Sequence, residues 1–176
     1  MQKYIVLLRG VMPTGTNKVP MAQLREQLSK AGLQNVKTYI QSGNVIAESK
    51  LKAAEIEVLV QDVIRKRFGG DLTIIAKTPQ QLRTILKVNP FPEDDTSRLY
   101  YTLLAAKPKA ESLKSFLALD FAPDEIKVVA QVIYSLYATK VSDSKYNNNF
   151  FERKLKVAAT TRNYNTMTKL LELATS

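Results

Sequence analysis

Side chains that could hold an anion are most concentrated in the sequence ATTRNYNT, residues 159–166, directly before an apolar helical pattern. A helix start leaves up to four backbone N–H groups without intrahelical partners. The side chains of Asn163, Asn165 or Thr166 are suited to accept hydrogen bonds from these groups. Helix capping therefore accounts for one or two of the crowded polar residues.

Capping does not explain Arg162. A cation beside the positive end of a helix dipole is unfavourable unless an anion or a carboxylate offsets it. We therefore expect Arg162 and Asn163, with free backbone amides, to bind a phosphate or an acidic group. In the alternative interpretation, Arg162 pairs with an internal carboxylate such as Asp143 or reaches solvent.

A glycine-containing loop, RGVMPTGTNK at residues 9–18, is a second candidate anion site. Gly10 and Gly15 have the spacing of a nucleotide-binding P-loop, but that loop needs Lys immediately after the second glycine. Here two residues separate Gly15 from Lys18, and a proline removes one backbone N–H group. An anion site formed by Arg9, Lys18 and loop amides and a purely structural loop both stay open.

The turn in YIQSGNV, residues 39–45, separates two strand-like runs. Gly43 and Asn44 tolerate the positive φ angles of a hairpin turn, so structural need alone can explain them. Alternatively, Ser42, Gly43 and Asn44 line a ligand pocket together with neighbouring loops.

The chain has no cysteine and no histidine, which excludes disulfides, zinc sites of the usual ligand types, thiolate nucleophiles and imidazole bases. Any catalysis would have to use carboxylate, Lys, Tyr, Ser or Thr groups. The acidic run at residues 93–95 is typical of a solvated linker, so we expect no metal site and no cofactor. Ser144 and Lys145 are adjacent and would point apart on a helix, so Ser142 or Ser144 is expected to be an N-cap rather than a nucleophile.

The formal net charge of +10 is unevenly distributed along the 176 residues. Residues 1–88 carry +8, residues 89–138 carry −2 and residues 139–176 carry +4. A basic face formed by the two ends would suit phosphates, nucleic acid or an acidic partner, although solubility alone also explains the charge. No apolar run approaches the length of about 20 residues that spans a bilayer, so we expect a soluble, cytoplasmic protein without a membrane partner.

The hydrophobic pattern predicts the same order of elements twice. The first half contains a strand at 3–8, a helix at 20–31, strands at 35–41 and 44–49, a helix at 51–68 and a strand at 71–77. A short helix capped by Thr78 and a proline-rich acidic connector follow. The second half contains a strand at 98–105, a helix at 109–119, strands at 125–131 and 132–138, a helix at 143–156, a strand at 157–161 and a final helix.

Each half has the order βαββαβ, which fits the ferredoxin-like plan. We therefore expect an α+β protein of two ferredoxin-like halves plus a C-terminal helix, forming one compact unit. The expected boundaries are 1–78 for the first half, 79–97 for the helix and connector, 98–161 for the second half and 162–176 for the last helix.

Several segments resemble a bacterial family known as domain of unknown function 1697. They are YIVLLRG, NKVPMAQLR, NVKTYIQSGNV, NPF, SK, KL and ATTRNYNTMTKLLELA. The resemblance implies an α+β fold with ferredoxin-like halves and no established activity. The family's motifs fall on Arg9, Gly10, Lys18, Tyr39, Ser42, Gly43, Asn44, Lys145, Arg162 and Asn163.

The chain departs from this family at two places. Members usually continue the first motif as Arg-Gly-Ile-Asn, where this chain has Val11 and Met12, and their Trp in the last motif is Tyr164 here. If the family's Asn, which Met12 replaces here, contacts a ligand, we expect this chain to bind that ligand differently.

Three functional hypotheses follow. The leading one is a protein that binds a phosphorylated or anionic small ligand at the 9–18 loop, the 42–44 turn and the 160–166 helix start, with Lys145 as a further candidate. The second is sequence-tolerant nucleic-acid binding, which the basic composition favours. The third is a hydrolase or transferase that uses carboxylate, Lys or Tyr groups.

Overall fold

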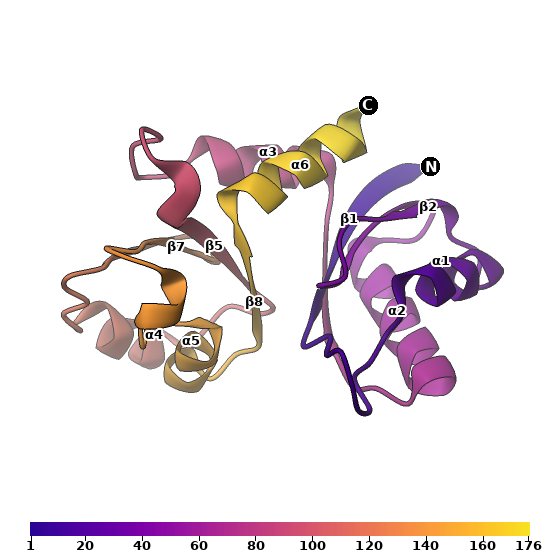
Figure 1. The fold of residues 1–176 in the computed structure, drawn as a ribbon, viewed down its shortest axis with the longest axis horizontal. Coiled ribbons are helices and arrows are strands. Elements are labelled where there is room, and N and C mark those ends of the chain that lie inside the picture. Colours follow the sequence, from indigo (N-terminus) through magenta and orange to yellow (C-terminus); the bar gives the residue numbers. More distant parts are fainter. The chain divides into compact units, whose positions relative to one another are not determined.

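The protein divides into two compact units, each with its own four-stranded antiparallel sheet (Figure 1). A computed structural model describes residues 1–176. Residues 1–84 and 169–176 form the first unit, and residues 85–168 form the second. Six α-helices accompany the two sheets, so the predicted α+β class is confirmed. None of these helices is long and apolar enough to cross a membrane.

The first sheet has the strand order β2-β3-β1-β4, with every neighbouring pair antiparallel. The elements are β1 (Gln2–Arg9), α1 (Met21–Lys30), β2 (Gln34–Thr38), β3 (Asn44–Ser49), α2 (Ala53–Phe68), β4 (Thr73–Lys77) and α3 (Pro79–Lys87). The sequence predicts all seven of these elements, with bounds that differ by a few residues. Thr78 caps α3 as expected, because its hydroxyl accepts a hydrogen bond from the backbone of Gln81 at 3.1 Å.

Strand β1 divides its side chains between the two faces of the first sheet, because alternate residues of a strand point to opposite sides. Tyr4, Val6 and Leu8 pack into a buried core with α1 and α2 (Figure 1). Ile5, Leu7 and Arg9 therefore lie on the opposite face. Helix α2 is fixed at both ends: Glu55 accepts the backbone N–H of Lys52 at 2.7 Å, and Gly69 ends the helix at φ +72°.

The second sheet has the corresponding order β6-β7-β5-β8, again with antiparallel pairs. Its elements are β5 (Leu99–Leu104), α4 (Ala110–Leu117), β6 (Glu125–Val129), β7 (Val132–Leu136), α5 (Asn148–Leu155) and β8 (Ala159–Asn163). Helix α6 (Tyr164–Thr175) follows β8 without a break, and two 3₁₀ turns lie at Thr96–Arg98 and Val141–Asp143.

An aromatic core lies on the face of the second sheet that α4 and α5 cover (Figure 1). Phe116 packs against Phe121 and Phe151, with ring centroids 5.1 and 5.8 Å apart. Tyr146 joins the same cluster through Phe121, and its backbone carbonyl accepts a hydrogen bond from the Tyr137 hydroxyl at 2.6 Å. These contacts leave the other face of the sheet for different side chains.

The start of α5 differs from the sequence prediction. A helix over 143–156 was expected, but α5 begins at Asn148, because the Asn147 side chain accepts the backbone N–H of Phe150 at 3.0 Å. The prediction that Ser142 or Ser144 caps this helix is therefore wrong. The Ser144 hydroxyl instead donates to Asp124 at 2.7 Å and accepts the backbone N–H of Tyr146.

The turn before β3 depends on glycine at position 43. Gly43 has φ +97°, and a Cβ added there would lie 2.8 Å from Leu8 Cβ and 2.9 Å from Val11 Cγ2. We expect Gly43→Ala to lower the free energy of unfolding by about 3 kcal/mol, because backbone strain and overpacking add. Gly15→Ala is the matched control: its φ is +84°, but nothing lies within 4 Å of the added Cβ.

Chemical denaturation measures the free energy of unfolding of the two variants. The Gly15→Ala control should lose only about 1 kcal/mol of this free energy, which is the cost of the left-handed backbone conformation alone. Equal losses in the two variants would show that packing against Leu8 and Val11 does not constrain the turn.

Candidate functional site

In the first unit, the structure brings together the end of β1 and the turn that precedes β3. The backbone N–H of Leu8 donates to the Gly43 carbonyl at 2.9 Å, and Leu7 lies opposite Asn44 in the sheet. Arg9 follows Leu7 two residues along the strand, so Arg9 and Asn44 share the face that α1 and α2 do not cover. Four of the predicted residues, Arg9, Gly10, Gly43 and Asn44, therefore form one corner of this sheet.

The side chain of Asn44 has a structural role in this corner. It is buried, and its amide donates to the Tyr39 carbonyl at 3.0 Å and to the Ser42 hydroxyl at 3.2 Å. The backbone carbonyl of Asn44 also accepts the N–H of Tyr39 at 2.9 Å. These bonds hold the turn closed, which supports the structural interpretation of Asn44.

The 9–18 loop uses several polar groups for its own closure. The N–H of Met12 donates to the Asn17 carbonyl, and the N–H of Lys18 donates to the Gly15 carbonyl. The Asn17 side chain accepts the N–H of Asp71 at 3.0 Å, which attaches the loop to the turn before β4. Two loop amides are thus engaged within the loop, and the exposed Lys18 side chain is the group it offers to a ligand.

In the second unit, Asn163 is the N-cap of α6. Its side-chain oxygen accepts the backbone N–H of Thr166 at 2.8 Å. Of the three predicted cap residues, Asn163, Asn165 and Thr166, Asn163 is therefore the one that caps the helix. The Thr166 hydroxyl is not the cap, and Asn165 is exposed. The Asn163 side chain is therefore occupied by the helix it begins.

Arg162 is held in a defined orientation beside this helix start. Its Nη1 donates to the Thr160 hydroxyl at 2.6 Å and to the Thr161 carbonyl at 3.0 Å. Thr161 itself points to the helix-covered face, where its hydroxyl bonds Thr102 and the side chain of Asn148. Since neighbouring strand residues alternate, Arg162 lies on the opposite face of the second sheet, which α4 and α5 do not cover.

Tyr101 lies directly opposite Arg162 across the β5–β8 ladder. Its ring contacts Tyr134 edge to face at 5.3 Å and stacks with Tyr164 at 6.4 Å between centroids. The Tyr134 hydroxyl donates to the Ile85 carbonyl at 2.7 Å, but the buried Tyr101 hydroxyl has no hydrogen-bond partner. Leaving such a group unsatisfied costs roughly 1–3 kcal/mol, so this hydroxyl is the polar group in the site that most needs a partner.

The protonation of these phenols follows from burial and from one carboxylate. Burial first, and then the Glu93 carboxylate, raise the pKa of Tyr101. The same two causes raise the pKa of Tyr164, whose hydroxyl lies 3.3 Å from Glu93 Oε2. Both phenols therefore stay protonated at neutral pH, and the Tyr101 hydroxyl is available as a hydrogen-bond donor.

The sequence prediction missed Tyr101 and Glu93 as members of this group. The hydrophobic pattern places Tyr101 in the strand at 98–105 without indicating a binding role, and residues 93–95 were expected to be a solvated linker. The pairing of Tyr101 with Arg162 depends on the register between β5 and β8, which has no local signal. The sequence could only indicate that alternate residues of β5 face opposite sides.

Lys145 does not join Arg162. Its ammonium group is exposed and lies 5.3 Å from the centre of the Tyr146 ring. Tyr146 belongs to the aromatic core on the helix-covered face of the second sheet, whereas Arg162 lies on the opposite face. These two predicted residues therefore occupy opposite sides of the same sheet.

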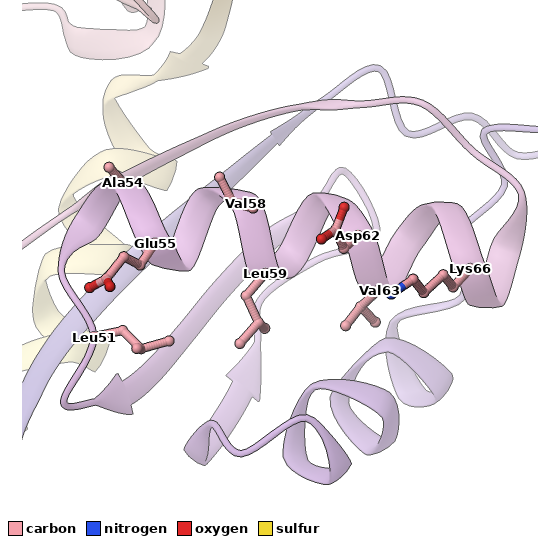
Figure 2. Close-up of a pocket in the computed structure, with 8 residues that line it drawn as sticks. All are labelled: Leu51, Ala54, Glu55, Val58, Leu59, Asp62, Val63 and Lys66. Carbon is pink, nitrogen blue, oxygen red and sulfur yellow. The ribbon is translucent and has the colours of Figure 1, made fainter.

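A groove of about 650 Å³ follows helix α2 in the first unit (Figure 2). Leu51, Leu59 and Val63 lie along one side of it, and Val58 is 59% exposed. The charged groups that line it, Glu55, Asp62 and Lys66, are spread along the helix instead of converging on one point. The groove has no set of polar groups that would orient a small anionic ligand.

Comparisons with known proteins agree with the architecture. A family model described as protein of unknown function (DUF1697) matches residues 1–134. A solved structure of the conserved bacterial protein SP0830 from Streptococcus pneumoniae is similar in fold, with a TM-score of 0.79 and 20% sequence identity over 100% of this chain and 99% of that one. The search of curated proteins finds no match.

Asn163 and Asn165 offer a matched pair of substitutions at the start of α6. We expect Asn163→Ala to lower the free energy of unfolding by about 1 kcal/mol, because the N–H of Thr166 loses its acceptor. Asn165→Ala should leave stability unchanged within about 0.5 kcal/mol, since Asn165 is an exposed helix position. Urea denaturation of both variants measures this difference, and a larger loss in Asn165→Ala would contradict the assigned cap.

Proposed function

Because the chain belongs to the DUF1697 family of proteins of unknown function, we propose a function from the chemistry of its own residues. It binds a phosphorylated or otherwise anionic small ligand at the β8–α6 junction, where the half-buried Arg162 lies on the side of the second sheet opposite α4 and α5. Arg162 is the residue that contacts the anion. The observation that carries this proposal is the unpartnered, buried hydroxyl of Tyr101, a residue that pairs with Arg162 across the β5–β8 ladder.

Three kinds of donor support an anionic ligand at this junction. The guanidinium of Arg162 supplies positive charge, and its bonds to Thr160 and Thr161 restrict the directions in which it can point. The N-terminal amides of α6 lie next along the chain, at the positive end of the helix dipole. The Tyr101 hydroxyl adds a neutral donor, which recovers its missing hydrogen bond when an anionic oxygen approaches.

Glu93 sets the selectivity of this site. Its carboxylate engages the Tyr164 hydroxyl at 3.3 Å and would repel a diffuse, highly charged ligand. A ligand with one compact anionic group, such as a phosphate monoester, brings less negative charge near this carboxylate than a polyanion does. The proposal is therefore of a small phosphorylated molecule in preference to nucleic acid.

The corner of the first unit is a separate part of the proposal. Arg9 and Asn44 share the face of the first sheet that α1 and α2 do not cover, and Gly10 and Gly43 allow the backbone to turn there. Ser42 and the exposed Lys18 lie in the adjoining turn and loop. We propose that this corner can bind an anion on its own, and we assign no such role to Lys145.

The architecture allows a finer description, which we also propose. Each half follows the order βαββαβ, and the strand orders β2-β3-β1-β4 and β6-β7-β5-β8 support a ferredoxin-like plan with boundaries near 1–78 and 98–161. We further propose that the protein acts in the cytoplasm.

Thermal unfolding with small anions tests the function. We expect one compound among phosphate, sugar phosphates and mononucleotides to stabilise the wild type, by roughly 2.7 kcal/mol at 100 times its dissociation constant. Arg162→Gln should remove this stabilisation, measured against its own ligand-free baseline. Tyr101→Phe should weaken it, while leaving the ligand-free protein as stable as wild type or up to about 1 kcal/mol more stable, because an unsatisfied hydroxyl is removed.

Tyr134→Phe is the matched control, because it removes the hydroxyl of the neighbouring ring on the same face. It should lose about 1 kcal/mol of ligand-free stability, since the Ile85 carbonyl loses its donor, and should keep the full ligand response. If Arg162→Gln and Tyr101→Phe respond to the ligand as wild type does, this site is not where the anion binds.

A further inference from the structure

A pocket lined by lysines lies in the second unit, on the side of its sheet that α4 and α5 cover. It has a volume of about 600 Å³ and lies between α4 and the segment that joins α5 to β8. Lys107 and Lys109 line it from the loop before α4, and Lys154 and Lys156 line it from the end of α5. Two segments about 50 residues apart in the sequence thus bring four lysines to the lining of one pocket.

These four charges have no local compensation by ion pairs. Glu111 is the one carboxylate that lines the pocket, and none of the four lysines forms an ion pair in the structure. The Nζ of Lys154 lies 5.8 Å from the centre of the Phe150 ring. Like charges that converge without partners repel each other, and the repulsion is relieved when an anion binds between them.

Helix dipoles explain the position of Lys154 but not the positions of Lys107 and Lys109. Lys154 lies in the last turn of α5, where a cation is favourable. Lys109 is the residue immediately before α4, and Lys107 precedes it, where a cation is unfavourable. Lys109 also makes no side-chain capping bond to α4. The lysines at α4 therefore serve no role in the helix that would account for their position.

We propose that this pocket binds a compact polyanion that carries two or more phosphate groups. Its volume lies within the range of small-molecule sites and exceeds the size of a single phosphate. Ammonium groups on flexible stems suit several phosphates at once, because each can follow a different oxygen. Ser112 and Ser115 on α4 add hydroxyl donors to the same lining. This site is separate from Arg162 and does not depend on it.

Isothermal titration calorimetry with tripolyphosphate tests the proposal. We expect saturable binding to the wild type that weakens as salt rises from 50 to 300 mM. Two double variants, Lys107→Gln with Lys109→Gln and Lys154→Gln with Lys156→Gln, should each weaken binding at least about tenfold, because each removes two charge-assisted contacts. Both double variants must bind tripolyphosphate more weakly than the wild type if the two segments form one site.

A third double variant, Lys87→Gln with Lys140→Gln, is the control. It removes the same charge from exposed positions of the same unit that do not line this pocket. It should change affinity by less than about threefold. Equal losses in all three double variants, or no binding by the wild type, would overturn the proposal.

A single-stranded oligonucleotide serves as a second titrant. The proposal predicts that tripolyphosphate displaces the oligonucleotide. It also predicts that the two pocket double variants weaken the binding of both ligands to the same extent. Tight oligonucleotide binding that tripolyphosphate cannot displace, and that the pocket variants leave intact, would instead assign the basic charge to an extended nucleic-acid surface and contradict a pocket for a compact polyanion.

Discussion

The alternation of side chains along β5 is the constraint on which the second unit depends. This strand is central in its sheet, paired with β7 on one side and with β8 on the other. Thr102 and Leu104 point to the face covered by α4 and α5, so Leu99, Tyr101 and Leu103 must point to the opposite face, where they too are buried. The register with β8 then brings Arg162 opposite Tyr101. A shift of one residue in that register would bury the guanidinium in the aromatic core.

The two anion sites that we propose differ physically. Arg162 is a half-buried guanidinium fixed by hydrogen bonds to its own strand. The lysines between α4 and α5 are exposed, flexible and unpaired. The first arrangement suits one anionic group in a defined direction, whereas the second suits several charges without a fixed geometry. The basic composition of the chain therefore serves more than solubility in this account.

The raised pKa values of the buried tyrosines argue against an enzyme that uses one of them as a base. Burial raises the pKa of Tyr134 to about 12, and burial is also the largest cause that raises the pKa of Tyr137 to about 12. The pKa of Tyr101 is raised as well. None of these three phenols is ionised at neutral pH, so none can act there as a phenolate base. Their chemistry is that of hydrogen-bond donors, which agrees with a binding site.

Much of the fold could be predicted from the sequence because its signals are local. Apolar periodicity located every strand and helix, and Gly32, Gly69 and Thr78 marked the ends of helices. The start of α5 was misplaced because Ser144 and Asn147 are both good caps, and the bond from Ser144 to Asp124 is a contact across about 20 residues. The unpartnered Tyr101 hydroxyl and the lysine pocket had no local signal at all, since each depends on which distant segments meet.

The most direct test of the account follows the side-chain Nε–Hε signal of Arg162 and the backbone amides of Tyr164 and Asn165 by NMR during titration with a phosphate monoester. The Arg162→Lys variant assigns the arginine signal. The account predicts that all three signals shift together and saturate at one dissociation constant. If these signals stay fixed while the monoester shifts only resonances elsewhere in the protein, the β8–α6 junction is not the anion site and the central claim is wrong.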